Sequence, residues 1–299
     1  MTGVQTWCSS DLSEIYLDAR RRLRAAGIEA AGLEARLLLA FAADKSTAEF
    51  LRDIRMFPDE AFSQRANELL RRRLAGEPAA YLTGSWSFYG LDLEINPNVL
   101  IPRADTELAV DAALDCLADT DEPRVLDLCT GSGCIGIAIA ARLPACRAVL
   151  ADLDRRALLL AKRNTLLTHV SARVLCAEAD VREGPSPRLG EFDLIVCNPP
   201  YVPTRELETL DPSVRDYEPR LALNGGEDGL DFYRSIFARW TGIIRPGGWL
   251  VMECGEGQSM ALRRMAEGAG LLATDTRVDS HGTERTLVFR KPGPGIQTE

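Results

Sequence analysis

The chain has 299 residues, enough for one large domain or two smaller ones, and its 46% hydrophobic and 26% charged residues are ordinary for a globular protein. Its formal net charge of −9 argues against bare nucleic acid as the main partner, because phosphate binding normally requires a basic surface. No apolar run reaches the roughly 18 residues that a membrane helix needs, and no signal-peptide core is visible. We therefore expect a soluble protein with no membrane partner.

The cysteines and histidines argue against the common metal and disulfide frameworks. The eight cysteines form no CxxC pair, and His169 and His281 are the only histidines. No metal site is therefore expected, and free thiols favour the reducing cytoplasm as the compartment. The basic run Arg71-Arg72-Arg73 is better explained as a solvated helix face than as a phosphate-binding patch. We expect no stable binding to nucleic acid.

Residues 1–12, MTGVQTWCSSDL, show no helical periodicity and no cap that leads cleanly into a helix. They resemble a translated sequencing adapter joined to a truncated gene. We therefore expect residues 1–12 to be a non-native leader and base no element of the predicted fold on them.

A small helical bundle is predicted over residues 13–77. Strong helix formers dominate this stretch. Apolar residues recur at helical spacing in three stripes, which are Ile15, Ala19 and Leu23; Leu33, Leu37, Leu38 and Phe41; and Phe62, Leu69, Leu70 and Leu74. Nothing here looks catalytic, so the bundle would either bind a substrate or partner, or act as a stabilising cap.

A β-hairpin linker is predicted over residues 78–103. Gly76-Glu77-Pro78 ends the last helix of the bundle. From Tyr81 to Ile95, apolar and polar residues alternate around Gly90, which is typical of two strands joined by a turn. The linker ends with Ile101-Pro102-Arg103.

Helices and strands alternate over residues 104–291, which predicts an α/β fold with a mostly parallel sheet covered on both faces. The expected strands are 124–128, 147–151, 173–177, 192–197, 249–254, 274–279 and 285–290. The expected helices are one that ends at Leu117, then 135–142, 155–167, 232–244 and 260–269. The last two strands would form a hairpin that supplies one antiparallel strand. We expect the tail 292–299 to be disordered.

Asn198-Pro199-Pro200-Tyr201 follows the apolar run 192–197, at the carboxyl end of a predicted buried strand. Two consecutive prolines remove two backbone donors, fix two φ angles and restrict the residue before each of them. The turn should therefore hold the Asn198 amide rigidly at the end of the strand. Ligands of open α/β sheets bind at this edge.

A glycine-rich loop, Asp127-Leu128-Cys129-Thr130-Gly131-Ser132-Gly133, ends an earlier strand and should face the same cleft. Its glycines let the chain pass close beneath a ligand, and the following helix presents its N-terminal amides there. The loop lacks the Gly-Lys-Ser/Thr ending of a P-loop. By itself it fits a dinucleotide, S-adenosylmethionine or a structural turn.

Acidic residues end the next two strands. Asp152 is placed to accept two hydrogen bonds from a ribose diol, whereas Asp154 is better explained as the N-cap of the helix from Arg155. Asp180 could accept a hydrogen bond from an adenine amino group while Val181 packs on the ring edge. A solvated turn is the alternative for Asp180.

The tetrapeptide distinguishes between these cofactors. A nicotinamide enzyme would need a hydride-transfer site with a catalytic side chain, and no histidine is a candidate. Asn198 Oδ1 and the Pro199 carbonyl could instead accept hydrogen bonds from both N–H groups of a planar nitrogen, on which Tyr201 stacks. That would orient a poor nucleophile for in-line attack on a sulfonium methyl group, without a strong general base. We therefore expect Asn198 to Tyr201, including Pro200, to be the catalytic site; a Pro-rich structural turn is the alternative.

The same chain carries the stretches GEPAAYLTG, FYGLDLEINPNVLIPRADTE, VLDLCTGSGCIGIAIA, ADLD, FDLIVCNPPY, DYEPRLALNGGEDGLDFYR and RPGGWLVMECGEGQ. On these stretches, and over nearly its whole length after residue 12, it resembles the HemK/PrmC family of protein-(glutamine-N5) methyltransferases. The Asn-Pro-Pro-Tyr motif alone is shared with DNA adenine and RNA guanine N-methyltransferases. The helical N-terminal stretch, the Ile-Pro-Arg exit and the Glu-Pro-Arg-Leu-Ala-Leu loop are far more specific.

The resemblance implies a class I, Rossmann-like methyltransferase domain with a seven-stranded sheet over residues 104–291. It implies methylation of the glutamine in the Gly-Gly-Gln loop of class I peptide chain release factors, which modulates translation termination. Asn198 to Tyr201 would hold that amide, and Glu218 to Leu223 would shape a wall or lid over the substrate. The residues implied to bind S-adenosylmethionine are Asp127, Cys129, Thr130, Gly131, Ser132, Gly133, Asp152, Asp180, Val181 and Asn198.

Two positions depart from the family pattern. Most relatives have glycine at the position of Cys129, so the loop must accept a Cβ or shift there. Relatives usually have proline at the position of Ala104, whereas Asp105 and Glu107 keep the acidic character. Neither change touches the acceptor tetrapeptide, so the expected activity stands.

Three other functions compete with methylation of a release factor. A glutamine methyltransferase of a ribosomal protein carries the same tetrapeptide, but the N-terminal bundle and the hairpin favour a release factor. A nucleic-acid amino methyltransferase would need a basic cleft and a base-reading insertion, which this acidic chain lacks. A cofactor-binding scaffold without catalysis would not need an intact tetrapeptide. We expect a cytoplasmic monomer.

Overall fold

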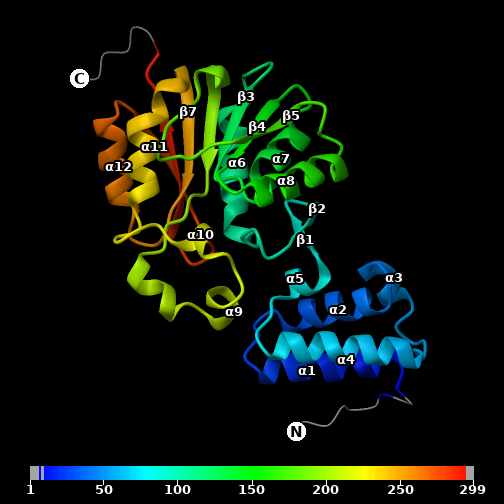
Figure 1. Ribbon diagram of the computed structural model, residues 1–299. Coiled ribbons are helices and arrows are strands. Elements are labelled where there is room, and N and C mark those ends of the chain that lie inside the picture. The colour runs from blue at the N-terminus through cyan, green and yellow to red at the C-terminus, as the bar shows by residue number, and fades with distance from the viewer. Residues whose placement is uncertain (1–6, 8–9, 294–299) are drawn as a thin grey trace. The chain divides into compact units, whose positions relative to one another are not determined.

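The computed structural model describes residue 7 and residues 10–293, and the chain divides into two compact units between Ser85 and Trp86 (Figure 1). The first unit is helical, and the second contains a large sheet with its covering helices. Most of the tail for which disorder is predicted, residues 294–299, lies outside the described residues.

The first unit is a helical bundle, as predicted. Its helices are α1 Leu12–Ala25, α2 Ala31–Ala42, α3 Thr47–Arg52, α4 Glu60–Leu74 and α5 Ala79–Thr83. Helix α2 packs against each of the other four helices. The apolar stripes predicted on α1 and α4 contribute Ile15, Leu23, Phe62 and Leu70 to the buried core.

The stripe predicted on α2 is partly wrong. Leu33 and Phe41 are 46% and 48% exposed, whereas Ala31, Ala35 and Leu39 are buried. Because α2 is surrounded by other helices, its small alanine side chains face the core and allow close packing. The hydrophobic periodicity correctly selected Leu38, which is buried, but it also selected Leu33 and Phe41, whose large side chains are exposed.

Helix α3 has no counterpart among the predicted elements. A capping box starts it: Ser46 Oγ accepts a hydrogen bond from Glu49 N at 3.2 Å, and Glu49 Oε2 accepts one from Ser46 N at 2.9 Å. Phe50 is fully buried in the bundle core. A short helix with one buried aromatic residue leaves too weak a periodic signal to be found from the sequence.

Three residues assigned to the leader take part in the bundle, which therefore begins before residue 13, where it was predicted to start. Asp11 caps α1, since its carboxylate accepts a hydrogen bond from Glu14 N at 2.9 Å. Leu12 is buried as the first residue of that helix, and Trp7 is 6% exposed in the same core. The rest of the supposed leader includes residues 1–6 and 8–9, which lie outside the described residues.

The predicted hairpin is present but shorter, with strands β1 Ser85–Phe88 and β2 Leu91–Glu94. Tyr89 and Gly90 form its turn, with φ of 51° and 76°. Tyr81–Thr83, predicted as part of the hairpin, lies in helix α5 instead. Apolar and polar residues alternate in this stretch as they would in a strand, but the side chains that are buried follow a helical turn. The helix ends at Gly84, which has a φ of 69°.

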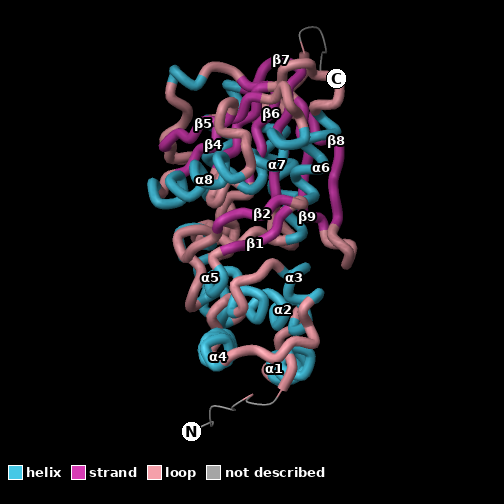
Figure 2. The backbone as a smooth tube through the Cα atoms, turned by 90° about the vertical axis from the view of Figure 1, so that its right-hand side faces the viewer, coloured by secondary structure: helices cyan, strands magenta, loops and turns pink. Residues whose placement is uncertain are grey.

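The second unit contains a seven-stranded, mostly parallel sheet, which confirms the predicted fold class. Its strand order is β5-β4-β3-β6-β7-β9-β8, and β9 alone runs opposite to the other six strands. Figure 2 shows these strands in the second unit. The strands are β3 Arg124–Leu128, β4 Arg147–Asp152, β5 Val174–Glu178, β6 Phe192–Cys197, β7 Ile244–Glu253, β8 Leu272–Val278 and β9 Glu284–Arg290.

Helices cover both faces of this sheet (Figure 1). Helices α6, α7 and α8 pack in a row on one face, and α11 and α12 pack together on the other. Their bounds are α6 Glu107–Cys116, α7 Cys134–Arg142, α8 Arg155–Leu167, α11 Asp231–Arg239 and α12 Ser259–Gly268. The core beneath α11 and α12 includes the fully buried side chains of Tyr233, Trp240 and Leu262.

Two boundaries near the end of the chain differ from the predicted ones. Helix α11 ends at Arg239 rather than at residue 244, and β7 begins at Ile244 rather than at residue 249. Ile244 pairs with Phe192 before the register of the two strands shifts. The Pro-Gly-Gly sequence within β7 was predicted to be a loop because such residues usually end a strand.

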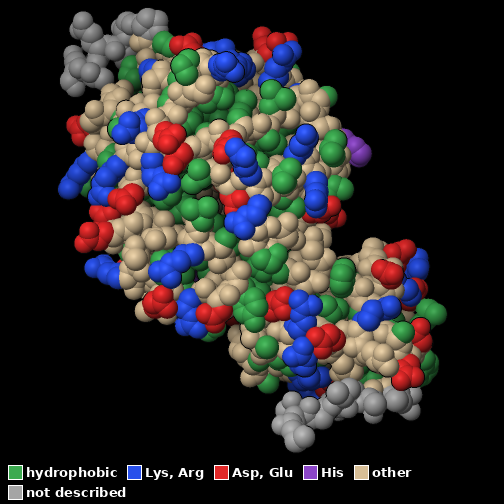
Figure 3. Space-filling view, in the orientation of Figure 1, with side chains coloured by type: hydrophobic (Ala, Val, Ile, Leu, Met, Phe, Trp, Pro, Cys, Tyr) green, Lys and Arg blue, Asp and Glu red, His purple; other side chains and the backbone are tan. Residues whose placement is uncertain are grey.

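Short helices occupy the long segment between β6 and α11, which the sequence predicts as a loop. They are η3 Thr204–Thr209, α9 Pro212–Arg215 and α10 Arg220–Leu223. Among the helices of residues 7 and 10–293, none combines the length and apolar composition needed to cross a membrane. On the face drawn in Figure 3, basic and acidic side chains are interspersed.

A buried ion pair joins α2 to α4. Arg73 Nε and Nη2 donate to the Glu34 carboxylate at 2.5 and 3.2 Å, and both side chains are nearly buried. We expect Glu34→Gln to lower the free energy of unfolding of the bundle by on the order of 3 kcal/mol, because Arg73 would remain buried without its counterion. Glu68→Gln, which breaks an exposed pair with Arg71, should leave urea denaturation unchanged. Equal effects of the two variants would contradict this account.

Candidate active site

The carboxyl ends of four parallel strands meet at one edge of the sheet. Leu128 of β3 is in register with Ala151 of β4 and with Cys197 of β6, and Cys197 is in register with Met252 of β7. The residues that follow these strands are therefore neighbours. A pocket lies at this edge, where ligands of such sheets bind.

Most of the predicted site residues line this pocket. They are Cys129, Thr130, Gly131, Ser132, Asp152, Asp180, Val181, Asn198 and Pro200. Four other predicted residues, Asp127, Gly133, Pro199 and Tyr201, are not part of its wall. Pro199 and Tyr201 flank Pro200, which does line the pocket, and Asp127 and Gly133 belong to the glycine-rich loop beside it.

The glycine-rich loop turns sharply after β3. Cys129, Gly131 and Gly133 have φ of 57°, 54° and 85°, which is the left-handed region that favours glycine. The loop therefore accepts the Cβ of Cys129 without leaving this conformation. A Cβ on Gly133 would lie 2.8 Å from Ile137 Cδ1, so the loop and helix α7 need the missing side chain to pack closely.

Asp127 lies beneath the loop and is fully buried. Its Oδ2 accepts hydrogen bonds from Thr130 Oγ1 at 2.5 Å and from Gly136 N at 2.9 Å, which ties the loop to helix α7. No described residue donates a hydrogen bond to its Oδ1. Burial raises the pKa of Asp127 to about 7, and the two hydrogen bonds oppose that rise.

Asp152 ends β4 and faces the pocket. Its Oδ2 accepts a hydrogen bond from Gly131 N at 2.8 Å, and its Oδ1 accepts one from Asp154 N at 2.9 Å. Each carboxylate oxygen keeps a second lone pair that can accept from a ligand. Burial raises the pKa of Asp152 above its ordinary value. Asp154 caps α8 as predicted, since it accepts a hydrogen bond from Arg156 N at 2.8 Å.

Asp180 and Val181 form the far side of the pocket, beyond β5. The Arg182 guanidinium lies against the Asp180 carboxylate at 2.7 Å and lowers the pKa of Asp180. Val181 is buried, and its carbonyl accepts a hydrogen bond from Trp240 Nε1 at 2.8 Å. This contact fixes the backbone at the place where a ring edge could pack.

The tetrapeptide Asn198 to Tyr201 starts at the end of β6. Asn198 Nδ2 donates to Thr106 Oγ1 at 3.3 Å, and Thr106 is itself a buried residue of the pocket wall. Tyr201 packs against the core between the sheet and α11. Burial raises the pKa of the Tyr201 phenol well above its ordinary value, so the ring stays neutral.

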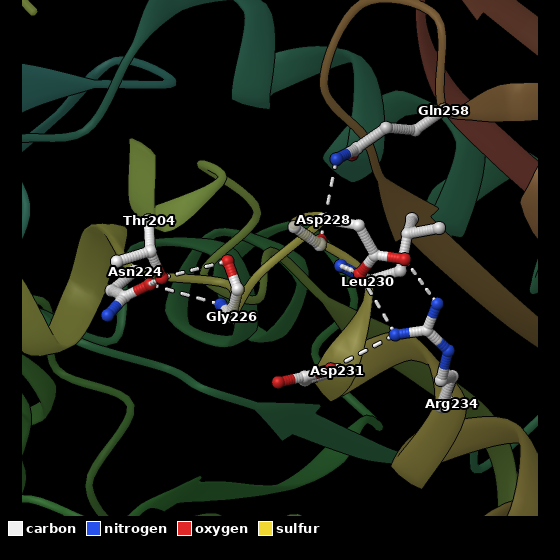
Figure 4. A network of polar contacts seen from close by, with 9 residues as sticks. Thr204, Asn224, Gly226, Asp228, Leu230, Asp231, Arg234 and Gln258 are labelled. Atoms are coloured by element: carbon white, nitrogen blue, oxygen red, sulfur yellow. Dashed lines mark hydrogen bonds and ion pairs between the residues drawn. The ribbon is translucent and has the colours of Figure 1, made fainter. Parts of the chain in front are cut away.

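A glycine-containing loop and Gln258, both drawn in Figure 4, contact the backbone of the tetrapeptide. Gln258 Nε2 donates to the Tyr201 carbonyl at 2.9 Å and to the Gly229 carbonyl at 3.4 Å, while its Oε1 accepts from Gly255 N at 2.9 Å. A Cβ on Gly225 would lie 2.8 Å from the Pro200 carbonyl oxygen. The chain therefore packs backbone against backbone around residues 200 and 201.

The same loop is fixed at both of its ends (Figure 4). Asn224 Oδ1 accepts hydrogen bonds from Thr204 Oγ1 at 2.8 Å and from Gly226 N at 3.0 Å. At the other end, Arg234 forms ion pairs with Asp228 and Asp231. We refer to Gln258 and the loop 224–231 as the brace.

Comparisons with known proteins place the chain in a family. A family model described as the PrmC N-terminal domain matches residues 14–84, and one described as the Methyltransferase small domain matches residues 103–215. The chain is 41% identical over 265 residues to the release factor glutamine methyltransferase of Geobacter sulfurreducens, covering 87% of this chain and 90% of that protein. The corresponding protein of Moorella thermoacetica is 39% identical over 277 residues, with 92% and 96% covered.

The chain belongs to the release factor glutamine methyltransferase family. Among solved structures, the hMettl16 catalytic domain matches with a TM-score of 0.58 over 78% of this chain and 84% of that chain. Its sequence identity of 16% supports a shared methyltransferase fold and nothing finer.

The predicted site omitted Asn164, which supports the pocket. Asn164 is fully buried, and its Nδ2 donates to the Ser132 carbonyl at 2.9 Å and to the Glu94 carbonyl at 3.0 Å. It thereby links the glycine-rich loop to strand β2. Because Asn164 lies within a helical stretch, no local signal sets it apart from a surface asparagine.

A second support closes the pocket wall. Glu218 is buried and accepts hydrogen bonds from Ile101 N at 3.2 Å and from Arg103 Nη2. Pro102 and Pro219, the neighbours of these residues, both line the pocket. The Ile-Pro-Arg and Glu-Pro-Arg stretches, which carried the resemblance, are therefore joined at the pocket by a buried carboxylate.

The raised pKa of Asp127 gives a pH-dependent stability. Protonation of this carboxyl stabilises the folded chain fully below about pH 4, and that contribution is lost as the pH rises through about 7. Asp127→Asn removes the titration. We therefore expect the free energy of unfolding of the variant, relative to that of the wild type, to rise between about pH 4 and about pH 7 by at most about 1.4 kcal/mol per pH unit. Above about pH 7 the difference between the two proteins should stay level. Urea denaturation at several pH values measures the difference; a constant difference would contradict the assignment.

The brace predicts different effects for two glycines of matched conformation. Gly229 and Gly257 have φ of 77° and 78°, but only a Cβ on Gly229 meets other atoms, with Tyr201 O at 2.3 Å. Both alanine variants carry about 1–2 kcal/mol of left-handed strain. We expect Gly229→Ala to slow methyl transfer by roughly 100-fold, because it displaces the tetrapeptide, and Gly257→Ala to stay near the wild-type rate. Equal rates would rule out the brace.

Proposed function

We propose that the protein methylates the side-chain amide nitrogen (N5) of the glutamine in the Gly-Gly-Gln motif of class I peptide chain release factors, with S-adenosylmethionine as methyl donor. The observation that carries the proposal is the position of Asn198 and Pro200 in the same pocket wall as the glycine-rich loop and Asp152. Acceptor-binding and donor-binding residues thus face one space. The names of the relatives support the choice of substrate.

The pocket fits S-adenosylmethionine in its chemistry. The Asp152 carboxylate retains acceptor capacity for a ribose diol. Val181 offers an apolar surface for a purine, and Gly131 and Ser132 bring backbone close to the cavity. When bound, S-adenosylmethionine supplies an electrophilic methyl group on a sulfonium, and the acceptor nitrogen gives up one proton in exchange for it.

The tetrapeptide would bind and orient the acceptor glutamine. Asn198 Oδ1 and the Pro199 carbonyl accept hydrogen bonds from the two N–H groups of the amide, which fixes the plane of the nitrogen. Tyr201, neutral and packed against the core, covers the amide and excludes water. Pro199 and Pro200 have fixed φ angles. They therefore hold Asn198 Oδ1 and the Pro199 carbonyl oxygen in place without the help of a hydrogen-bonded turn.

Release factors are favoured over ribosomal proteins and nucleic acid as the substrate. The first unit supports this choice, because residues 14–84 match the PrmC N-terminal domain. The net charge of −9 argues against a nucleic-acid substrate, and basic and acidic side chains are interspersed on the face drawn in Figure 3. We infer that the protein acts in the cytoplasm as a monomer.

Labelled S-adenosylmethionine offered with a class I release factor, a ribosomal protein and DNA tests the substrate. We expect label on the release factor alone, at the glutamine of the Gly-Gly-Gln motif. A release factor with alanine in place of that glutamine is the control and should stay unlabelled. Label on the ribosomal protein or on DNA instead would overturn the proposal.

Two substitutions test the assigned roles separately. Asn198→Ala should reduce methyl transfer by at least about 100-fold, while calorimetry shows nearly unchanged binding of S-adenosylmethionine. Asp152→Ala should weaken that binding by about 10-fold or more, because two hydrogen bonds to the ribose are lost. Methyl transfer at the wild-type rate by Asn198→Ala would refute the role of the tetrapeptide.

A further inference from the structure

Glu253 is a buried carboxylic acid beside the acceptor tetrapeptide that no step so far has used. It is the last residue of β7 and only 3% exposed. Cys197 and Met252 are in register across the parallel strands β6 and β7, so the next residues, Asn198 and Glu253, are also neighbours. Glu253 does not line the pocket.

The polar contacts of Glu253 point toward Asn198. Its carboxyl interacts with the side chains of Thr106 and Asn198. Asn198 Nδ2 also donates to Thr106 Oγ1 at 3.3 Å, so the three side chains form one cluster. No described residue donates a hydrogen bond to Glu253 Oε2. The Glu253 backbone is held separately, because Tyr233 Oη donates to its carbonyl at 2.9 Å.

An asparagine amide has two nearly isosteric ends, and a half-turn about its last bond exchanges them. The acceptor glutamine requires the oxygen end of Asn198 in the pocket, because its own nitrogen only donates. A carboxylate only accepts, so it attracts the Asn198 NH2 group and repels the oxygen. A carboxylate behind Asn198 therefore selects the orientation that catalysis needs.

We propose that Glu253 is a positioning residue that fixes the Asn198 amide with Oδ1 directed at the acceptor glutamine. Thr106 assists by taking one N–H of the same amide. The proposal rests on the proposed function, because it assumes that Asn198 binds the acceptor. Glu253 does not line the pocket, so it would act through Asn198.

The charge state of Glu253 sets the conditions for a test. Burial raises its pKa to about 7, Asp105 adds to the rise, and Thr106, Arg285 and Asn198 oppose it. Assays at about pH 8 therefore examine the ionised form. Glu253→Gln keeps the shape of the side chain but can present either an oxygen or an NH2 group, so both orientations of Asn198 become satisfied.

We expect Glu253→Gln to lower kcat for methylation of the release factor by about 10-fold or more. The KM for S-adenosylmethionine and the Tm should stay at their wild-type values. Thr286→Val is the matched control. Thr286 is in register with Glu253 on β9 and equally buried, and its hydroxyl has no partner among the described residues. This variant should retain the wild-type kcat.

A double-mutant cycle separates positioning from general damage. Thr106→Val and Glu253→Gln act on the same amide, so their combined effect on kcat should be smaller than the product of the single effects. Wild-type kcat in Glu253→Gln, a fall in its Tm that accompanies the loss, or a raised KM for S-adenosylmethionine would each overturn the inference. These results leave the proposed function intact, because the labelling of the release factor tests that function separately.

Discussion

The in-register parallel pairing of four strands is the constraint on which the site depends. Leu128, Ala151, Cys197 and Met252 form one row across the sheet, so each strand ends at the same level. The glycine-rich loop and the tetrapeptide, which we propose to bind the methyl donor and the acceptor, are about 70 positions apart in the chain and become neighbours through this register. A shift of one residue in β6 would turn Asn198 to the opposite face of the sheet.

The loops above this row are held by buried polar contacts rather than by their own regular structure. Asp127, Asn164 and Glu218 are each buried, and each joins two segments distant in sequence. Because an unpaired buried polar group costs free energy, these contacts define one arrangement of the pocket wall. Glu253 belongs to the same class, with the difference that its partner is a side chain of the acceptor site.

The sequence was informative wherever function restricts local chemistry. The tetrapeptide, the glycine-rich loop and Asp152 could be predicted because prolines, glycines and a carboxylate at strand ends have few other uses. Asn164 and Glu253 could not be predicted, because an asparagine in a helix and a glutamate at the end of a strand carry no local sequence signal. Only the register of distant strands gives these residues a role. Leu33 was misplaced for a similar reason, since the neighbours of a helix decide which of its faces is buried.

The central claim is that the tetrapeptide is already arranged to receive a glutamine amide. A crystal structure with S-adenosylhomocysteine and a peptide containing the Gly-Gly-Gln motif tests this most directly. The account predicts that the backbone of residues 198–201 moves by less than about 1 Å, and that the amide nitrogen donates to Asn198 Oδ1 and to the Pro199 carbonyl. A glutamine bound elsewhere, or an Asn198 that turns its NH2 group to the substrate, would contradict it.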